Sequence, residues 1–132
     1  KIPFDKYYGK LFAWLKEKRL RPAGPPLGIF HDKPEEVPAK KCRSDIGVPI
    51  RGRARSGREI KVKKIPSATV ARITHRGPMK DYGKTYEKLH RWIEENGYVW
   101  AGPAMELYIS KPKMVGGKLS IFSVIQAPIK KA

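Results

Sequence analysis

The chain has 132 residues and a formal net charge of +17, from 29 Lys and Arg against 12 Asp and Glu. Its length favours one domain, and its 40% hydrophobic content is enough for a packed core, which excludes a disordered basic tail. No apolar stretch approaches the roughly 18 residues of a membrane span, and the amino terminus is not a secretion signal. We therefore expect a soluble, cytoplasmic domain, as a monomer or a dimer.

The numbers and positions of cysteine and histidine exclude two further classes of protein, disulfide-stapled scaffolds and zinc ribbons. The single Cys42 cannot form an internal disulfide, and the three histidines are widely scattered, so no metal ion or other cofactor is expected. The excess of basic residues lacks the matching rise in acidic residues that thermophilic proteins show. It therefore indicates attraction to a polyanion, either nucleic acid or an anionic membrane surface.

The sequence contains an internal repeat at an offset of 78 positions. Its matches include Tyr8 with Tyr86, Leu11 with Leu89, Trp14 with Trp92, and Ala23-Gly24-Pro25 with Ala101-Gly102-Pro103. We expect copy one over residues 1–50, a basic linker over 51–63 and copy two over 64–132. Equivalent residues of a repeat most often pack, so Trp14 and Trp92 are predicted to be core residues.

Copy one comes first in the chain. Its pattern predicts, in order, a helix from Tyr7 to about Leu20, a strand from Pro26 to His31, a loop from Asp32 to Lys41, and a strand from Arg43 to Ile50. The strand that opens copy two has no counterpart, because Lys64 corresponds to a position about 14 residues ahead of Lys1. We expect residues preceding Lys1 to supply that strand, since folded proteins seldom leave a sheet edge bare.

Copy two shows the same succession of helical and strand-like sequence patterns more clearly. It predicts a strand over 69–74 that stops at Gly77-Pro78, a helix carrying Tyr82, Tyr86, Leu89 and Ile93 that ends at Asn96-Gly97, a strand over 104–109, a turn over 114–118, and a last strand over 118–125. These elements predict an α+β fold.

Four motifs in copy two carry a family resemblance. They are Gly77-Pro78 before the helix, Leu89-His90-Arg91-Trp92 within it, Glu95-Asn96-Gly97-Tyr98 at its end, and the segment from Ala101 to Tyr108 that leads into the strand. In this order they resemble the GyrI-like small-molecule-binding domains, also found as effector-binding domains of multidrug-sensing transcription activators. The resemblance implies a duplicated strand-helix-strand-strand unit with pseudo-twofold symmetry. It also implies an antiparallel sheet with two helices on one side, a ligand cleft between the copies, and Glu106 as the pocket carboxylate.

The residues around Glu106 support a pocket independently. Glu106 lies mid-strand between apolar neighbours, where a charge needs a partner or water. Ala104 and Tyr108 share its face, and the repeat matches Glu106 with Gly28, so that Gly28 and Phe30 face Glu106 and its neighbours. A carboxylate with aromatic walls suits a lipophilic cation. The alternative is that Glu106 pairs with an Arg or Lys of the same chain.

Further aromatic residues are candidates for the pocket walls or, equally, for the core. They are Tyr7, Tyr8, Tyr82 and Trp100. Some members of the family are hydrolases that open strained cyclopropane rings, and Glu106 would be their general base if burial raised its pKa. Glycine at the matching position 28 supplies no second acid, so binding is favoured over catalysis.

The densest basic segment joins the two copies. It carries Arg51, Arg53, Arg55, Arg58, Lys61, Lys63 and Lys64, against Glu59 alone. Such a run is either a solvated linker or an arm that contacts phosphate groups without reading sequence. No aromatic residue is interleaved, so base stacking is not indicated.

The main functional hypothesis is a domain that binds a small organic ligand, with a nucleic-acid or anionic-surface binder and a hydrolase as alternatives. The given chain shows no helix-turn-helix or other DNA-reading unit ahead of the domain, so we expect a regulator role to need a separate DNA-binding domain or partner. The segment from Asp32 to Arg43 also resembles part of a membrane-anchored autophagy receptor, which raises the hypothesis of an anchor upstream. The positive field opposes a cationic ligand, which makes a neutral or anionic one more plausible than the resemblance alone implies.

Overall fold

The structure is a computed structural model that describes residues 4–31, 43–65 and 67–132, with side chains from residue 6 onward. Its elements are α1 (Phe4–Glu17), β1 (Leu27–Phe30), β2 (Ser44–Gly47), β3 (Val70–Pro78), the short 3-10 helix η2 (Met79–Asp81), α2 (Tyr82–Glu95), β4 (Tyr98–Trp100), β5 (Ala104–Tyr108), β6 (Lys113–Val115) and β7 (Lys118–Lys131). The predicted loop from Asp32 to Lys41 and Cys42 lie outside the described residues.

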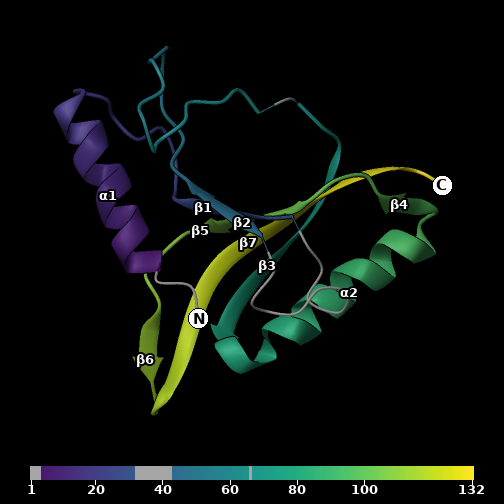
Figure 1. Ribbon diagram of the computed structural model, residues 1–132. Helices are drawn as coiled ribbons and strands as arrows, with labels where there is room; N and C mark the ends of the chain where they lie inside the picture. Colours follow the sequence, from purple (N-terminus) through teal and green to yellow (C-terminus); the bar gives the residue numbers. More distant parts are fainter. Residues whose placement is uncertain (1–3, 32–42, 66) are drawn as a thin grey trace.

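The strands form one curled antiparallel sheet in the order β2-β1-β5-β7-β3, with β4 and β6 paired to the two ends of β7 (Figure 1). The long strand β7 passes through the middle of the sheet and contacts four other strands. In the pairing of β1 with β5, Gly28 lies directly opposite Glu106. The two positions that match in the repeat are therefore neighbours across the two strands. The predicted α+β fold is confirmed.

Several boundaries differ from those predicted. β3 extends to Pro78 and β7 to Lys131, because each pairs with the other along nine consecutive positions and β7 then continues alongside β4. The three-residue strand β4 was not predicted, since it is too short to show an alternating pattern. The turn predicted over 114–118 is shorter in the structure. Only Gly116 and Gly117, both with positive φ, form it, and residues 114 and 115 belong to β6.

The core lies between α2 and the sheet. Leu89 and Ile93 of α2 are buried against Ile125 and Ile129 of β7, and Ile93 and Ile125 are fully inaccessible to solvent. Each such side chain contributes roughly 1.5–3 kcal/mol of hydrophobic burial. This packing fixes the side of α2 that faces the strands and therefore where its tyrosines lie.

The prediction that Trp92 is a core residue is wrong. Its side chain is 48% exposed and stacks on Tyr98, with ring centroids 6.2 Å apart and planes 6° from parallel. Leu89 and Ile93 occupy the positions that face the sheet, so the intervening Trp92 falls at the edge of that face. Its counterpart Trp14 is half-buried against the backbone of Gly57 in the linker.

The linker has no regular secondary structure, although local hydrogen bonds shape it. The Gly57 amide donates to the Ile60 carbonyl at 2.7 Å, and the Val62 amide donates to Ser56 Oγ at 2.8 Å.

No helix in the described part of the chain is long and apolar enough to cross a membrane. Over the same residues, no group of three or more His, Cys, Asp or Glu side chains is arranged to hold a metal ion.

Candidate functional site

The candidate site is centred on the carboxylate of Glu106 in the middle of β5. Glu106 pairs with Gly28 of β1 on one side and with Ile125 of β7 on the other, so it lies in the interior of the sheet rather than at an edge. Only 6% of the residue is exposed. A carboxylate this deeply buried requires compensating hydrogen bonds, because desolvation of a charge is costly.

Tyrosine hydroxyl groups supply those hydrogen bonds. Tyr86 of α2 donates to Oε2 of Glu106, and Tyr108, two residues along β5, donates to Oε1 at 3.0 Å. Both carboxylate oxygens are therefore partnered, and both partners are neutral groups. These hydrogen bonds stabilise the charged form of the carboxyl without neutralising it.

A third tyrosine comes from the start of α2. Tyr82 lies one helical turn before Tyr86, and their rings meet edge to face with centroids 5.6 Å apart. The Tyr82 hydroxyl hydrogen-bonds Ser123 Oγ of β7 at 2.8 Å. Burial, and then the nearby Glu106 charge, raise the pKa of Tyr82 well above its usual value, so this hydroxyl stays protonated.

A fourth tyrosine approaches from α1. The Tyr8 hydroxyl donates to the Leu27 carbonyl of β1 at 2.5 Å. Burial and the charge of Glu106 raise the pKa of Tyr8 as well. Helices α1 and α2 thus each send a tyrosine hydroxyl toward the central β1–β5 pair, and these are the two residues, Tyr8 and Tyr86, that the repeat matches.

Gly28 provides the space in which these groups meet. A Cβ atom at this position would lie 2.8 Å from the Tyr108 hydroxyl and 3.2 Å from the ring of Phe30. Both distances are shorter than ordinary contacts, so the absence of a side chain allows Tyr108 to reach Glu106. One strand thus carries the charge and the other leaves the space beside it.

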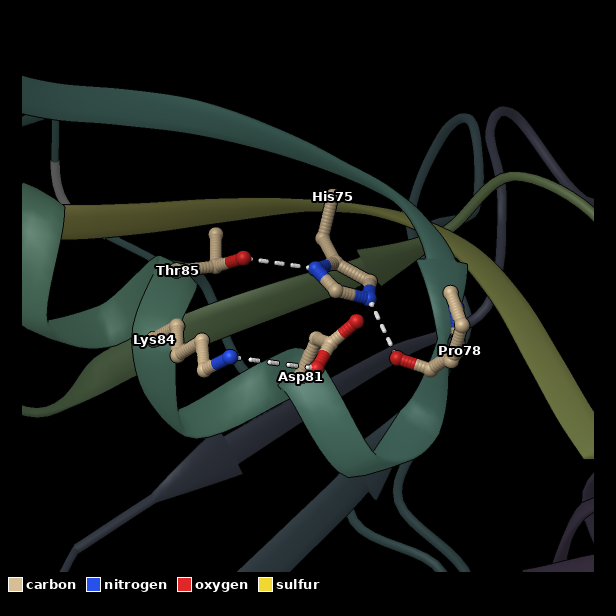
Figure 2. Close-up of polar contacts among 5 residues, drawn as sticks. All are labelled: His75, Pro78, Asp81, Lys84 and Thr85. Carbon is tan, nitrogen blue, oxygen red and sulfur yellow. Dashed lines mark hydrogen bonds and ion pairs between the residues drawn. The ribbon is translucent and has the colours of Figure 1, made fainter.

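A buried histidine holds the start of α2 in place (Figure 2). His75 of β3 is 5% exposed; its Nε2 lies 3.1 Å from the Pro78 carbonyl and its Nδ1 lies 2.6 Å from Thr85 Oγ1. A carbonyl only accepts, so Nε2 donates to Pro78, while the Thr85 hydroxyl partners Nδ1 on the other side of the ring. The His75 ring also packs edge to face on Tyr82 at 4.9 Å, which fixes that tyrosine beside Glu106.

The protonation of Glu106 reflects this environment. Burial raises the pKa of its carboxyl above the usual value, while the tyrosine hydrogen bonds and His75 oppose the rise. Loss of a tyrosine hydroxyl would therefore raise the pKa further, whereas a bound positive charge would lower it.

The structure brings six of the seven predicted ligand-binding residues to one place: Gly28, Phe30 and Tyr8, with Tyr82, Glu106 and Tyr108. Trp100 lies elsewhere, because it pairs with Ile129, four residues along β7 from the partner of Glu106, and its indole donates to His90 Nδ1 at 3.1 Å. Tyr7 is 44% exposed beneath the Lys10 ammonium group. Sequence reasoning did not select Tyr86, Ser123 or His75, although the match of Tyr86 with Tyr8 was a usable signal.

The predicted polyanion-binding residues form a separate, exposed region. All seven basic side chains from Arg51 to Lys64 are exposed. In the described part of the chain, two surface hollows of about 670 and 400 Å³ lie where the linker crosses Trp14 of α1, and Arg58 lines both. Neither hollow is lined by Glu106, so the basic surface and the buried carboxylate are distinct features.

These observations define an α+β domain in which two helices cover a curled sheet and a buried, tyrosine-bound carboxylate. A family model described as the GyrI-like small molecule binding domain matches residues 2–117, and the chain therefore belongs to that family. The chain is also 30% identical to a DNA gyrase inhibitor of Erwinia billingiae (strain Eb661) in an alignment of 114 residues that covers 83% of this chain and 72% of that protein.

Two solved structures of EcmrR share the fold. The crystal structure of the EcmrR C-terminal domain matches with a TM-score of 0.74 at 23% identity, over 95% of this chain and 83% of that one. The cryo-EM structure of an EcmrR–DNA complex matches with the same TM-score and identity, over 96% of this chain and 50% of that one. The present chain thus spans about half the length of EcmrR in that complex, and the likeness concerns the fold.

Proposed function

We propose that this domain binds a small, largely apolar organic ligand and that Glu106 selects for a positively charged or hydrogen-bond-donating group on it. The observation that carries the proposal is the pair of hydroxyl donors, Tyr86 and Tyr108, on a carboxylate that is only 6% exposed. Family membership supports the general class of activity. The identity of the selected group is inferred from the chemistry of the site.

Neutral donors make the carboxylate available to a ligand. A hydroxyl hydrogen-bonds a carboxylate but leaves its charge in place, and a cation entering this low-dielectric site would gain strong Coulomb attraction. The rings of Tyr82 and Tyr86 would add cation–π contacts of about 0.5–2 kcal/mol each. These hydroxyl partners favour the ligand-binding role over an internal ion pair with Arg or Lys.

Ligand entry requires the tyrosines to move. Each oxygen of Glu106 accepts one hydroxyl and keeps further acceptor capacity, but the residue is only 6% exposed, so a ligand reaches it only if the surrounding tyrosines shift. The displaced hydroxyl can turn to donate to or accept from the ligand itself. We therefore expect a ligand to move the tyrosine side chains that cover Glu106.

A thermal-shift screen tests the proposal. Aromatic cations, their neutral analogues and aromatic carboxylates are compared on the unmodified chain, on Glu106→Gln, and on Glu87→Gln as a matched control on the exposed side of α2. We expect stabilisation by compounds with a positive or donor group, lost in Glu106→Gln and kept in Glu87→Gln. Equal shifts in all three proteins would remove the role assigned to the carboxylate.

A second candidate function is nucleic-acid binding by the linker, supported by the exposure of its seven basic side chains. Each phosphate contact steepens the dependence of affinity on salt, so a titration with duplex and single-stranded DNA tests it. A flat response up to physiological salt would dispose of this function. EcmrR was solved bound to DNA, and a comparable role here would need a separate DNA-binding domain or partner.

A further inference from the structure

The β6–β7 hairpin is a second feature that the ligand site does not explain. Lys113–Val115 pairs with Lys118–Ser120 through the tight turn at Gly116 and Gly117, whose φ angles are 56° and 77°. Those left-handed values match the two-residue turn that twists in the same sense as its strands. In Figure 1 the hairpin extends past both helices at one end of the molecule. The hairpin therefore projects from the body of the domain.

The tip of this hairpin is apolar and open to solvent. Met114 is 66% exposed, Val115 is 61% exposed and Leu119 is 41% exposed. Met114 and Leu119 lie opposite each other across the hairpin, so their side chains share one face. Val115 pairs with Lys118 and lies on the other face, so the projecting turn exposes apolar side chains on both faces at its tip. Exposed apolar surface of this kind is typical of a contact surface.

The surroundings of the tip are basic. Lys111, Lys113 and Lys118 are exposed, and the chain from Ile109 to Ile121 contains no acidic residue. The hairpin therefore combines an apolar tip with positive flanks, in a chain whose formal net charge is +17. Its partner must offer both an apolar phase and negative charge.

We propose that the β6–β7 hairpin docks the domain on the surface of an anionic lipid bilayer. Met114 and Val115 enter the boundary between headgroups and acyl chains, while the three lysines remain at the level of the anionic headgroups. A lipid surface fits better than nucleic acid, because phosphates would attract the lysines but offer nothing to the apolar tip. Docking through the hairpin leaves the basic linker and the Glu106 site free of the membrane contact.

Vesicle co-sedimentation of the full chain tests this at about 150 mM salt, where long-range charge effects are screened. Vesicles of phosphatidylcholine alone are compared with vesicles that contain about 30 mol% phosphatidylserine. One variant, Met114→Asp with Val115→Asp, alters the tip at two exposed positions where folding is not at risk. The control, Arg53→Glu with Arg55→Glu, makes the same number of exposed substitutions in the linker and removes more positive charge.

We expect binding to the phosphatidylserine vesicles, reduced roughly tenfold or more by the tip variant and about threefold or less by the linker variant. Equal binding to vesicles without phosphatidylserine, greater loss in the linker variant, or no binding at all would each overturn the proposal. Self-association of the chain through Met114 and Val115, seen as a dimer that the tip variant abolishes without vesicles, would replace it with another explanation.

A second measurement reports insertion directly. A Cys42→Ser, Met114→Cys chain carries an environment-sensitive fluorophore at the tip. We expect a blue shift of its emission with phosphatidylserine vesicles and none with phosphatidylcholine vesicles. An unchanged spectrum alongside sedimentation would show purely electrostatic adhesion and contradict insertion by the hairpin.

Discussion

Gly28 and Glu106 lie directly opposite each other on neighbouring strands at the centre of the sheet. The glycine leaves the space through which the Tyr108 hydroxyl reaches the carboxylate. This pair therefore combines the buried charge with the opening that its hydrogen bonds need. Substitutions on either side of it have distinct, measurable effects.

Replacing Gly28 with alanine should displace Tyr108. The added Cβ would lie 2.8 Å from the Tyr108 hydroxyl, so the ring must shift and its hydrogen bond to Glu106 weakens. We expect a loss of about 1–3 kcal/mol in the free energy of unfolding, measured by urea denaturation. Gly83→Ala is the control: it lies on α2 with no atom within 4 Å of the added Cβ, and should be neutral or stabilising. Equal effects of the two changes would contradict the account of Gly28.

Replacing Tyr86 with phenylalanine should leave Oε2 of Glu106 without its donor. We expect a cost of about 1–3 kcal/mol at neutral pH, since the partner is a buried charged group. The cost should shrink in acid, where the carboxyl is protonated and needs less stabilisation. Tyr7→Phe, at a 44% exposed position, should have little effect on unfolding at any pH. A cost for Tyr86→Phe that does not vary with pH would assign it to packing instead.

The pH dependence of stability should change in Glu106→Gln. Burial raises the pKa of Glu106 in the folded protein, so the stability that this group contributes is fully present below its unfolded pKa, near 4.5, and is lost as pH rises through the folded value. We therefore expect Glu106→Gln to become more stable relative to the unmodified chain as pH increases from about 4 to 8. Urea unfolding across that range measures the difference. Parallel curves for the two proteins would show that the carboxyl is not perturbed by folding.

The salt dependence of ligand affinity should distinguish the electrostatic field of the whole molecule from the local effect of Glu106. The net charge of +17 repels cations at long range, and salt screens that repulsion, whereas Glu106 acts at short range inside the protein. The affinity for a cationic ligand is thus expected to rise modestly from about 20 to 150 mM salt, and that for an anionic ligand to fall. Fluorescence titration at several salt concentrations reports both. Cation affinity that falls steeply with salt would place the binding on an exposed acidic surface instead.

The alternating and helical periods of copy two predicted the α+β class and most of the elements, whereas the family came from the resemblance carried by four motifs. A charge in the middle of an apolar strand also marked out Glu106, and the structure shows that this residue is buried; its role in ligand binding stays a prediction. The helical period placed Tyr86, Leu89 and Ile93 on one face but did not separate the residue that reaches the carboxylate from those that pack in the core. That distinction depends on where α2 crosses β5 and β7.

Other features depended on tertiary contacts that no local pattern records. Trp92 lies one position from the buried Ile93, and its stacking on Tyr98 requires β4, a strand too short to predict. The full length of β7 follows from its pairing with β3 and β4. His75 gave no sequence signal, because its role in holding Tyr82 arises only when β3 and α2 come together.

The most direct test of the central claim compares an aromatic cation with a neutral analogue of the same shape, each titrated against the unmodified chain and Glu106→Gln by calorimetry. We predict that the unmodified chain prefers the cation by about tenfold or more, as expected for a buried charge pair. We also predict that Glu106→Gln binds both compounds with similar affinity. The same preference for the cation in both proteins would contradict the claim that Glu106 selects the ligand.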